Sequence, residues 1–201
     1  MENKKVVIAG GGVLGTQIGL ICAYHGFDTT FWLRSESSIG RTTPKIERYS
    51  ALMLEDLAKA KALIGNPIGG MLYPRGLIRS WQGITAEAID ALIEEGKKNF
   101  AEKVHIELDL KKALSGAYLV IESMTEEPKA KIGMYEAMRD LLDEDTILCT
   151  NSSTLLPACL RNTPAGPKST ARCTLPTRSG KTTPAKSWAI RARIPRSTTP
   201  S

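Results

Sequence analysis

The stretch KKVVIAGGGVLGTQIGLICAYHGFDTTFWL, residues 4–33, decides the fold of this chain. It opens with a β-branched run at 4–9, which is typical of a buried parallel strand. A glycine-rich turn follows, then apolar residues in helical spacing over 13–26, and then a second apolar run over 27–33. Strand, turn, helix and strand in this order predict a βαβ unit, whose crossover is right-handed almost without exception.

The turn matches the fingerprint of dinucleotide-binding sheets, Gly10-x-Gly12-x-x-Gly15. The first glycine allows a tight turn, the second lets the backbone approach a pyrophosphate, and the third lets the helix pack close to the strand. The pyrophosphate would lie at the positive end of the helix that begins near Val13. The cofactor-binding residues predicted in this turn are Gly10, Gly11, Gly12, Val13, Leu14 and Gly15.

Helices and strands continue to alternate as far as Pro157. Further helices are predicted at 44–65 (with Pro44 in its first turn and Gly65 after its end), at 85–103 capped by Thr85, at 109–114 capped by Asp109, and at 127–144. Further strands are predicted at 104–108, 117–124 and 146–151. The alternation predicts an α/β domain over 1–157, with a Rossmann-type doubly wound parallel sheet and a helical insertion.

Charge divides the chain at the same point. The formal net charge is +6 over the whole chain, but residues 1–157 hold 18 Lys and Arg against 21 Asp and Glu. Residues 158–201 hold 9 basic residues and no acidic one, with 8 Thr, 6 Pro and 5 Ser. A tail of this composition, with no apolar periodicity, is predicted to be disordered. The domain itself is mildly acidic and lacks a basic stripe, so we expect no nucleic-acid partner.

Cysteine spacing and hydropathy exclude several other classes of protein. The cysteines stand singly, so neither a disulfide framework nor a metal site is expected. No run approaches the roughly 20 apolar residues of a membrane span. The apolar run at the start is broken by glycines and lacks a cleavage site for secretion. These features predict a cytoplasmic protein that does not bind a membrane.

The acid expected at the end of the second strand is missing. Leu33 and Arg34 stand there, with Glu36 two residues further on. Arg34 would favour NADP if it contacted a 2′-phosphate, whereas Glu36 would favour NAD if it reached the ribose hydroxyl. Arg34 as an ordinary exposed loop residue is the third interpretation.

Three stretches together resemble the N-terminal domain of the 3-hydroxyacyl-CoA dehydrogenases. They are VVIAGGGVLGTQIGLICAYHGFDTTF, AYLVIESMTEEPKAKIGMYEAM and TILCTNSSTLLP. The resemblance covers 4–157 and is loosest over 44–103. It implies an NAD-dependent oxidoreductase of fatty-acid metabolism that moves a hydride between NAD and the 3-hydroxyl carbon of a 3-hydroxyacyl-CoA. It also implies a homodimer for full-length members, formed through a helical C-terminal domain.

The same resemblance implies roles for individual residues. Glu126 and Lys131 match the family's acidic and basic residues beside the nicotinamide ribose. Ser153 matches the active-site serine that hydrogen-bonds the substrate's 3-oxygen, and Asn151 precedes it as in the family. The alternatives are solvated charges at a helix start and ordinary capping residues. Glu122, inside a strand, is either a supporting residue of the site or a buried acid with satisfied hydrogen bonds.

The base that the family uses is missing from this chain. The family's histidine and the glutamate that orients it follow the Thr-Asn-Ser-Ser stretch, but residues 158–201 contain neither residue type. The chain's two histidines, His25 and His105, do not stand at the family's position and are interpreted as structural.

A change of reading frame explains both the missing base and the unusual tail. Permitted codons for Ala171–Lys181, read from the third base, give Ala-Leu-His-Phe-Ala-Asn-Glu-Ile-Trp-Lys, which resembles the family's histidine segment. A tyrosine in place of that histidine needs only one different third base. We therefore predict that the frame slips near Pro157, leaving a truncated and inactive enzyme. The alternatives are another Rossmann dehydrogenase, such as a ketopantoate-type reductase, and a non-catalytic dinucleotide-binding module.

Overall fold

A computed structural model describes residues 4–73, 76–125, 127–151 and 170–172 of the chain. Its centre is a sheet of six parallel strands in the order β3-β2-β1-β4-β5-β6. The strands are β1 (Lys5–Ala9), β2 (Asp28–Trp32), β3 (Val104–Glu107), β4 (Ala117–Glu122), β5 (Ile147–Thr150) and β6 (Thr170–Arg172). This is the strand order of the Rossmann fold, and the predicted doubly wound sheet is confirmed.

The strand β1 lies in the middle of the sheet and pairs with β2 on one side and with β4 on the other. The chain builds the sheet outward from β1 through β2 to β3, then returns to β4 and builds in the opposite direction. The connections that leave β1 and β4 therefore diverge at the carboxyl ends of these two strands. In open α/β sheets, ligands bind in the crevice at such a point.

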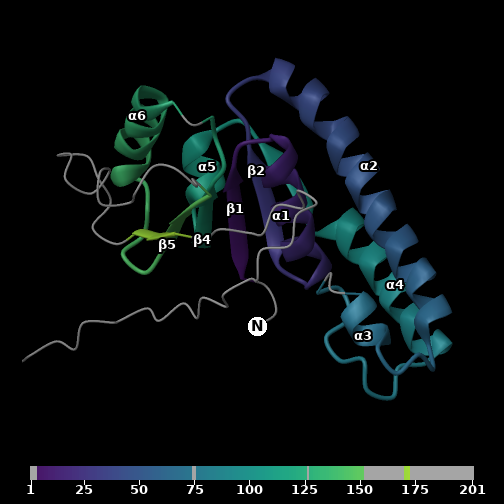
Figure 1. Cartoon of the computed structure of the whole chain (residues 1–201). Helices are drawn as coiled ribbons and strands as arrows, with labels where there is room; N and C mark the ends of the chain where they lie inside the picture. The colour runs from purple at the N-terminus through teal and green to yellow at the C-terminus, as the bar shows by residue number, and fades with distance from the viewer. Residues whose placement is uncertain (1–3, 74–75, 126, 152–169, 173–201) are drawn as a thin grey trace, which may run out of the picture.

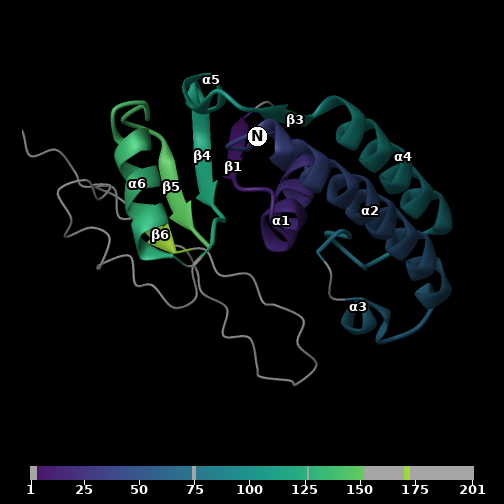
Figure 2. The ribbon, with the colours of Figure 1, turned by 90° about the horizontal axis from the view of Figure 1, so that it is seen from above.

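Helices cover both faces of the sheet. They are α1 (Val13–Tyr24), α2 (Glu36–Ala60), the 3-10 turn η1 (Lys61–Leu63), α3 (Gly69–Leu72), α4 (Ala86–Glu102), α5 (Leu110–Leu114) and α6 (Pro128–Arg139). Seen from above, α1, α2 and α4 lie on one side of the sheet and α6 on the other (Figure 2). No helix in the described part of the chain is long and apolar enough to cross a bilayer.

Side chains of β1 alternate between two cores. Val6 and Ile8 pack with Ile18 of α1 on one face, and Val7 packs with Met138 of α6 on the other. All four residues of 6–9 are at most 1% exposed. Burial on both faces explains why this strand is a continuous apolar run rather than an alternating one.

The long helices α2 and α4 form the predicted helical insertion and lie side by side at one edge of the molecule (Figure 1). Leu57 of α2 and Ile89 of α4 are fully buried and share a third core with Tyr24 of α1. The Tyr24 hydroxyl donates to the Leu77 carbonyl over 2.9 Å. Burial raises the pKa of Tyr24 to about 12.

The start of α2 differs from the prediction. The helix begins at Glu36, so the predicted start at Pro44 is wrong and the proline lies inside the helix. Ser35 has the extended backbone of an N-cap, and Glu36 places an acid in the first turn, where the helix dipole favours it. Proline removes the N–H that would bond the carbonyl of Gly40. Both residues are exposed, so water can reach that carbonyl.

The other predicted elements are confirmed, with shifts at their ends. Thr85 caps α4 and Asp109 caps α5 through their side chains, while α6 ends at Arg139 rather than at residue 144. The sequence pattern does not predict β6, which pairs in parallel with β5. The rest of the predicted tail, residues 158–169 and 173–201, lies outside the described residues.

Candidate functional site

A cavity of about 530 Å³ opens at the carboxyl edge of the sheet. Residues 10–14 after β1 line it, together with the end of β2 and the first turns of α2. Residues 123–125 after β4 and Asn151 after β5 complete its wall. The cavity therefore lies where the order of the strands predicts a ligand.

The glycines of the turn differ in what surrounds them. Gly10 has a φ of 129°, and a Cβ there would lie 2.5 Å from the carbonyl oxygen of Ser123. A Cβ on Gly15 would lie 2.9 Å from the carbonyl oxygen of Gly10. At Gly12 a Cβ would meet nothing within 4 Å, and this residue lines the cavity. Gly10 and Gly15 therefore allow close packing, and Gly12 leaves open space for a ligand.

The N-terminus of α1 opens into the same cavity. Gly12 is its N-cap residue, no side chain caps it, and its first turn contains no acid. The first N–H groups of a helix have no partner within the helix, and they attract anions together with the helix dipole. The turn and this helix end fit the pyrophosphate of a dinucleotide. Gly11, Val13 and Leu14 line the cavity beside them.

The opening turns of α2 form a basic wall. Thr42 and Lys45 donate to the carbonyl of Gly11 over 3.4 and 3.3 Å, which ties α2 to the glycine turn. Arg41 follows the same side of the helix and lines the cavity, as does Arg34 at the end of β2. Glu36 is exposed and is not part of the lining. Of the two residues considered for cofactor selectivity, Arg34 is the one at the cavity.

A buried ion pair lies behind the opposite wall of the cavity, where Ser123, Met124 and Thr125 form the lining. The Lys131 ammonium donates to both carboxylate oxygens of Glu122, over 2.8 and 2.7 Å. The side chains are 1% and 0% exposed, respectively. Lys131 is not part of the cavity lining. The structure thus places Lys131 in a buried ion pair, whereas the resemblance implied a residue beside the nicotinamide ribose.

The Glu122 carboxylate accepts further hydrogen bonds. The hydroxyls of Tyr135 and Thr150 donate to it over 3.2 and 2.7 Å. The backbone N–H of Met124 donates to it over 2.7 Å. Glu122 is therefore a buried acid with satisfied hydrogen bonds, and the bond to Met124 fixes the loop that lines the cavity.

Asn151 lines the cavity at the end of β5. Its side-chain amide donates to the Ser123 hydroxyl over 3.3 Å, and its backbone N–H donates to the Glu122 carbonyl over 2.8 Å. These bonds hold the residues that follow β4 and β5 together. Glu126 and Ser153, the other two residues implied by the resemblance on this side, lie outside the described residues.

The two histidines lie away from the cavity. His25 follows the last residue of α1, a twelve-residue helix that begins at the cavity and is roughly 18 Å long. Burial lowers the pKa of His25. His105 in β3 is half-exposed, with Nε2 3.0 Å from Asp28 Oδ1. Within the described part of the chain, no group of three or more His, Cys, Asp and Glu could hold a metal ion.

The structure adds cavity residues that sequence reasoning missed: Trp32, Leu33, Ser38, Arg41, Thr42, Lys45, Ser123, Met124 and Thr125. The sequence did contain a signal for the cavity residues on α2. Ser35 followed by Glu36 is a common pattern at the start of a helix. For residues 123–125 the position just past a buried strand was the available signal.

Comparison with known families gives a match to a dehydrogenase domain. The sequence model described as 3-hydroxyacyl-CoA dehydrogenase, NAD binding domain, matches residues 76–172. Residues 76–172 of this chain are thus similar to the NAD-binding domain of that family. The description of the matching model names NAD as the cofactor of such domains. The match runs on past Pro157 and includes β6, so similarity to the family extends beyond the point where the frame change was predicted.

Solved structures of dehydrogenases and reductases share the fold. A diketoreductase that acts on dicarbonyl compounds matches with 26% identity and a TM-score of 0.57, over 80% of this chain and 46% of its own. The 3-hydroxybutyryl-CoA dehydrogenase of Escherichia coli K12 matches with 17% identity and a TM-score of 0.52, over 87% and 30%. The (S)-3-hydroxybutyryl-CoA dehydrogenase of Ralstonia eutropha matches with 14% identity and a TM-score of 0.51, over 76% and 42%.

This chain spans less than half the length of each of these proteins. Comparison with curated proteins gives no match.

Proposed function

We propose that the chain is the cofactor-binding part of a 3-hydroxyacyl-CoA dehydrogenase and that these 201 residues bind the dinucleotide without appreciable turnover. The observation that carries the proposal is the cavity shared by the glycine turn and the residues after β4 and β5. When bound, NAD would supply the acceptor for the hydride of the 3-hydroxyl carbon of an acyl-CoA. Every other step depends on the side chains that surround it.

Binding and orientation fall to the turn and to the residues after the strands. The N-terminus of α1 and the open space at Gly12 accept the pyrophosphate. Asn151 lies at the other side of the cavity, and its amide can both donate and accept hydrogen bonds. Its bond to Ser123 holds this amide in place. Ser153, close behind it in sequence, is the proposed partner of the substrate's 3-oxygen.

The described residues that line the cavity offer no histidine or carboxylate to accept the proton that leaves the hydroxyl. None of those that line the cavity is a histidine, an aspartate or a glutamate. General-base assistance contributes about 10²–10⁴-fold to such reactions. The proposed lack of turnover follows from this.

Calorimetry and a turnover assay test the two parts separately. NAD(H) should bind the purified chain, and 3-hydroxybutyryl-CoA with NAD should give no oxidation above the background rate. Failure of NAD(H) and NADP(H) alike to bind would overturn the cofactor site. Rapid oxidation would contradict the proposal that the chain lacks a general base. Reduction of ketopantoate with NADPH would favour the ketopantoate-type reductase instead.

We also propose the change of reading frame near Pro157 as the origin of the missing base. DNA sequencing across codons 150–175 should reveal the shifted reading. A version with the frame restored should oxidise 3-hydroxybutyryl-CoA or a longer homologue and form a homodimer, whereas the present chain should not dimerise. Light scattering measures the oligomeric state, and an inactive restored version would count against the proposal.

A further inference from the structure

Three cations line one end of the cavity and have no acidic partner among the residues that the structure describes. Arg34 lies in the short loop between β2 and α2, and Arg41 and Lys45 lie on the first turns of α2. Both arginines are exposed, and the lysine is half-buried. Within the described residues, none of the three forms an ion pair with a carboxylate. This end of the cavity therefore carries uncompensated positive charge.

Neutral groups hold two of these cations in place. The Arg41 guanidinium donates to the Ser38 hydroxyl over 2.9 Å and to the Ser37 hydroxyl over 3.5 Å. The Lys45 ammonium donates to the carbonyls of Gly11 and Arg41. These bonds position the charges at the cavity and leave them unneutralised.

The residue that would select an unphosphorylated ribose is absent from this wall. In dinucleotide-binding sheets, an acid near the end of the second strand bonds the ribose 2′-hydroxyl, whereas an arginine there accommodates a 2′-phosphate. Here Arg34 lines the cavity, and Glu36, the nearest acid in sequence, does not. A 2′-phosphate would therefore meet cations at this wall, with no carboxylate in the lining to repel it.

We infer that this basic wall binds the 2′-phosphate of NADP(H), so that the chain binds NADP(H) more tightly than NAD(H). The inference rests on the proposed dinucleotide site and adds its selectivity. A phosphate monoester carries a charge of about −1.5 to −2 at neutral pH. Arginine presents a planar fork of N–H donors that matches phosphate oxygens. Arg34 and Arg41 are the selectivity residues, and Lys45 holds α2 against the turn.

Direct binding measurements test this inference. NADPH and NADH are titrated into the wild-type chain, Arg34→Gln and Arg41→Gln, with calorimetry as the readout. NADPH should bind wild type more tightly than NADH, and each variant should lose about tenfold or more in NADPH affinity, as is typical for hydrogen bonds to charged groups. NADH affinity should fall much less than NADPH affinity. Arg48→Gln is the matched control, because Arg48 is exposed on α2 and is not part of the cavity lining.

Two bisphosphate fragments separate the position of the phosphate from its charge. Adenosine 2′,5′-bisphosphate should bind more tightly than adenosine 3′,5′-bisphosphate, which has the same charge and occurs in coenzyme A. Equal affinity for the two fragments, or tighter binding of the 3′,5′ isomer, overturns the inference. So does equal affinity for NADH and NADPH, which leaves the dinucleotide site itself intact. Absence of binding by either cofactor would instead mean that the proposed function has failed.

Discussion

Basic residues on the two sides of the cavity differ in whether they are paired with an acid. On the α6 side, the Lys131 ammonium is buried against Glu122 and does not reach the cavity. On the α2 side, Arg34 and Arg41 line the cavity, and no described carboxylate pairs with either of them. The difference lies in what the sheet places opposite each helix. A cation that pairs with a buried acid of a strand becomes part of the core. A cation without such a partner stays available to bind a ligand.

Removing the buried cation should have the largest effect. Lys131→Met leaves the Glu122 carboxylate buried without its counter-charge, and breaking a buried pair from one side typically costs about 3–5 kcal/mol. We expect a loss of this size in the free energy of unfolding, measured by urea denaturation. The freed carboxylate should also disturb the loop at Met124, because the Met124 N–H donates to it.

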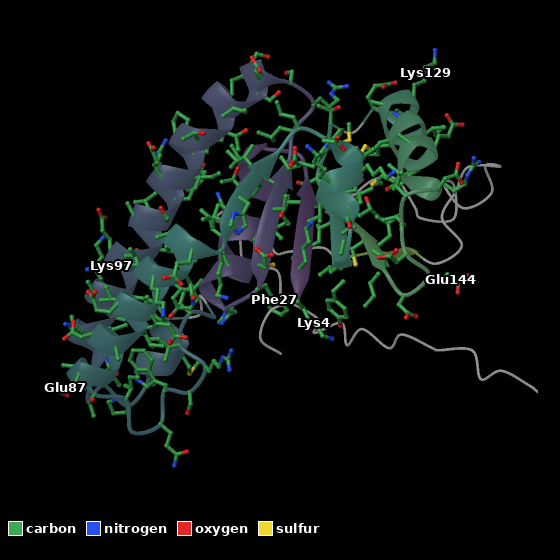
Figure 3. The ribbon with its side chains drawn as sticks, turned by 180° about the vertical axis from the view of Figure 1, so that it is seen from behind. Lys4, Phe27, Glu87, Lys97, Lys129 and Glu144 are labelled. Carbon is green, nitrogen blue, oxygen red and sulfur yellow. The ribbon has the colours of Figure 1, made fainter. Side chains whose placement is uncertain are left out.

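Lys129→Met is the matched control for that experiment. Lys129 lies at the start of the same helix and points outward into solvent (Figure 3). Surface substitutions of this kind usually change stability by no more than about 0.5 kcal/mol. Equal losses in the two variants would show that Lys131 is not a structural cation.

Filling the open space at Gly12 should abolish cofactor binding and leave the fold intact. In Gly12→Val the new side chain enters space where nothing lies within 4 Å, and a φ of −70° suits any residue. We expect binding of NADH and NADPH to be lost together in calorimetry, since their pyrophosphates are the same. Circular dichroism should be unchanged, and a variant that retains wild-type affinity would contradict the placement of the pyrophosphate.

Ser123→Ala should have a smaller effect. It removes the acceptor of the Asn151 amide, and a single hydrogen bond typically contributes about 0.5–1.5 kcal/mol. We expect a modest loss in unfolding free energy together with weaker binding of both cofactors, because this bond joins the loops after β4 and β5. Ser115→Ala, in the turn before β4, serves as the comparison. A loss of stability without any change in cofactor affinity would show that the Asn151–Ser123 bond does not support the binding site.

Raising the salt concentration should produce the smallest effect. It should weaken binding at the basic wall and leave the buried Lys131–Glu122 pair nearly unchanged. Between about 0.1 and 1 M ionic strength, the screening length falls from about 10 Å to about 3 Å. The affinity for NADPH should therefore fall more than that for NADH, because the exposed arginines contact only the phosphorylated cofactor. The difference in unfolding free energy between wild type and Lys131→Met should stay nearly constant, because buried pairs are screened less. Parallel titrations at two potassium chloride concentrations measure both.

Most of the fold follows from patterns that act locally. The β-branched runs, the glycine turn and the capping residues Thr85 and Asp109 each have a physical role within a few residues. The start of α2 was missed because a proline near a helix usually marks its first turn. Here Pro44 lies on an exposed part of the helix, where the loss of one backbone bond is tolerated.

Because the predicted helix begins too late, the α2 side of the cavity was not predicted either. Residues 36–43, which precede the predicted helix, form the two turns that bring Ser38 and Arg41 to the cavity. On the other wall, sequence spacing places Lys131 near the start of a helix but does not reveal which strand residue faces it. The pairing with Glu122 depends on how α6 packs on the sheet, and that is a tertiary property.

The hydrogen bonds between α2 and the glycine turn also affect the entropy of cofactor binding. The Gly11 carbonyl accepts from both Thr42 and Lys45, and the N–H of Gly10 donates to the carbonyl of Trp32. Fixing one residue's backbone costs about 1–2 kcal/mol in conformational entropy. In this turn, folding fixes the backbone before any cofactor arrives, so association does not have to order the loop. Pre-organised loops of this kind release more of their contact energy as affinity.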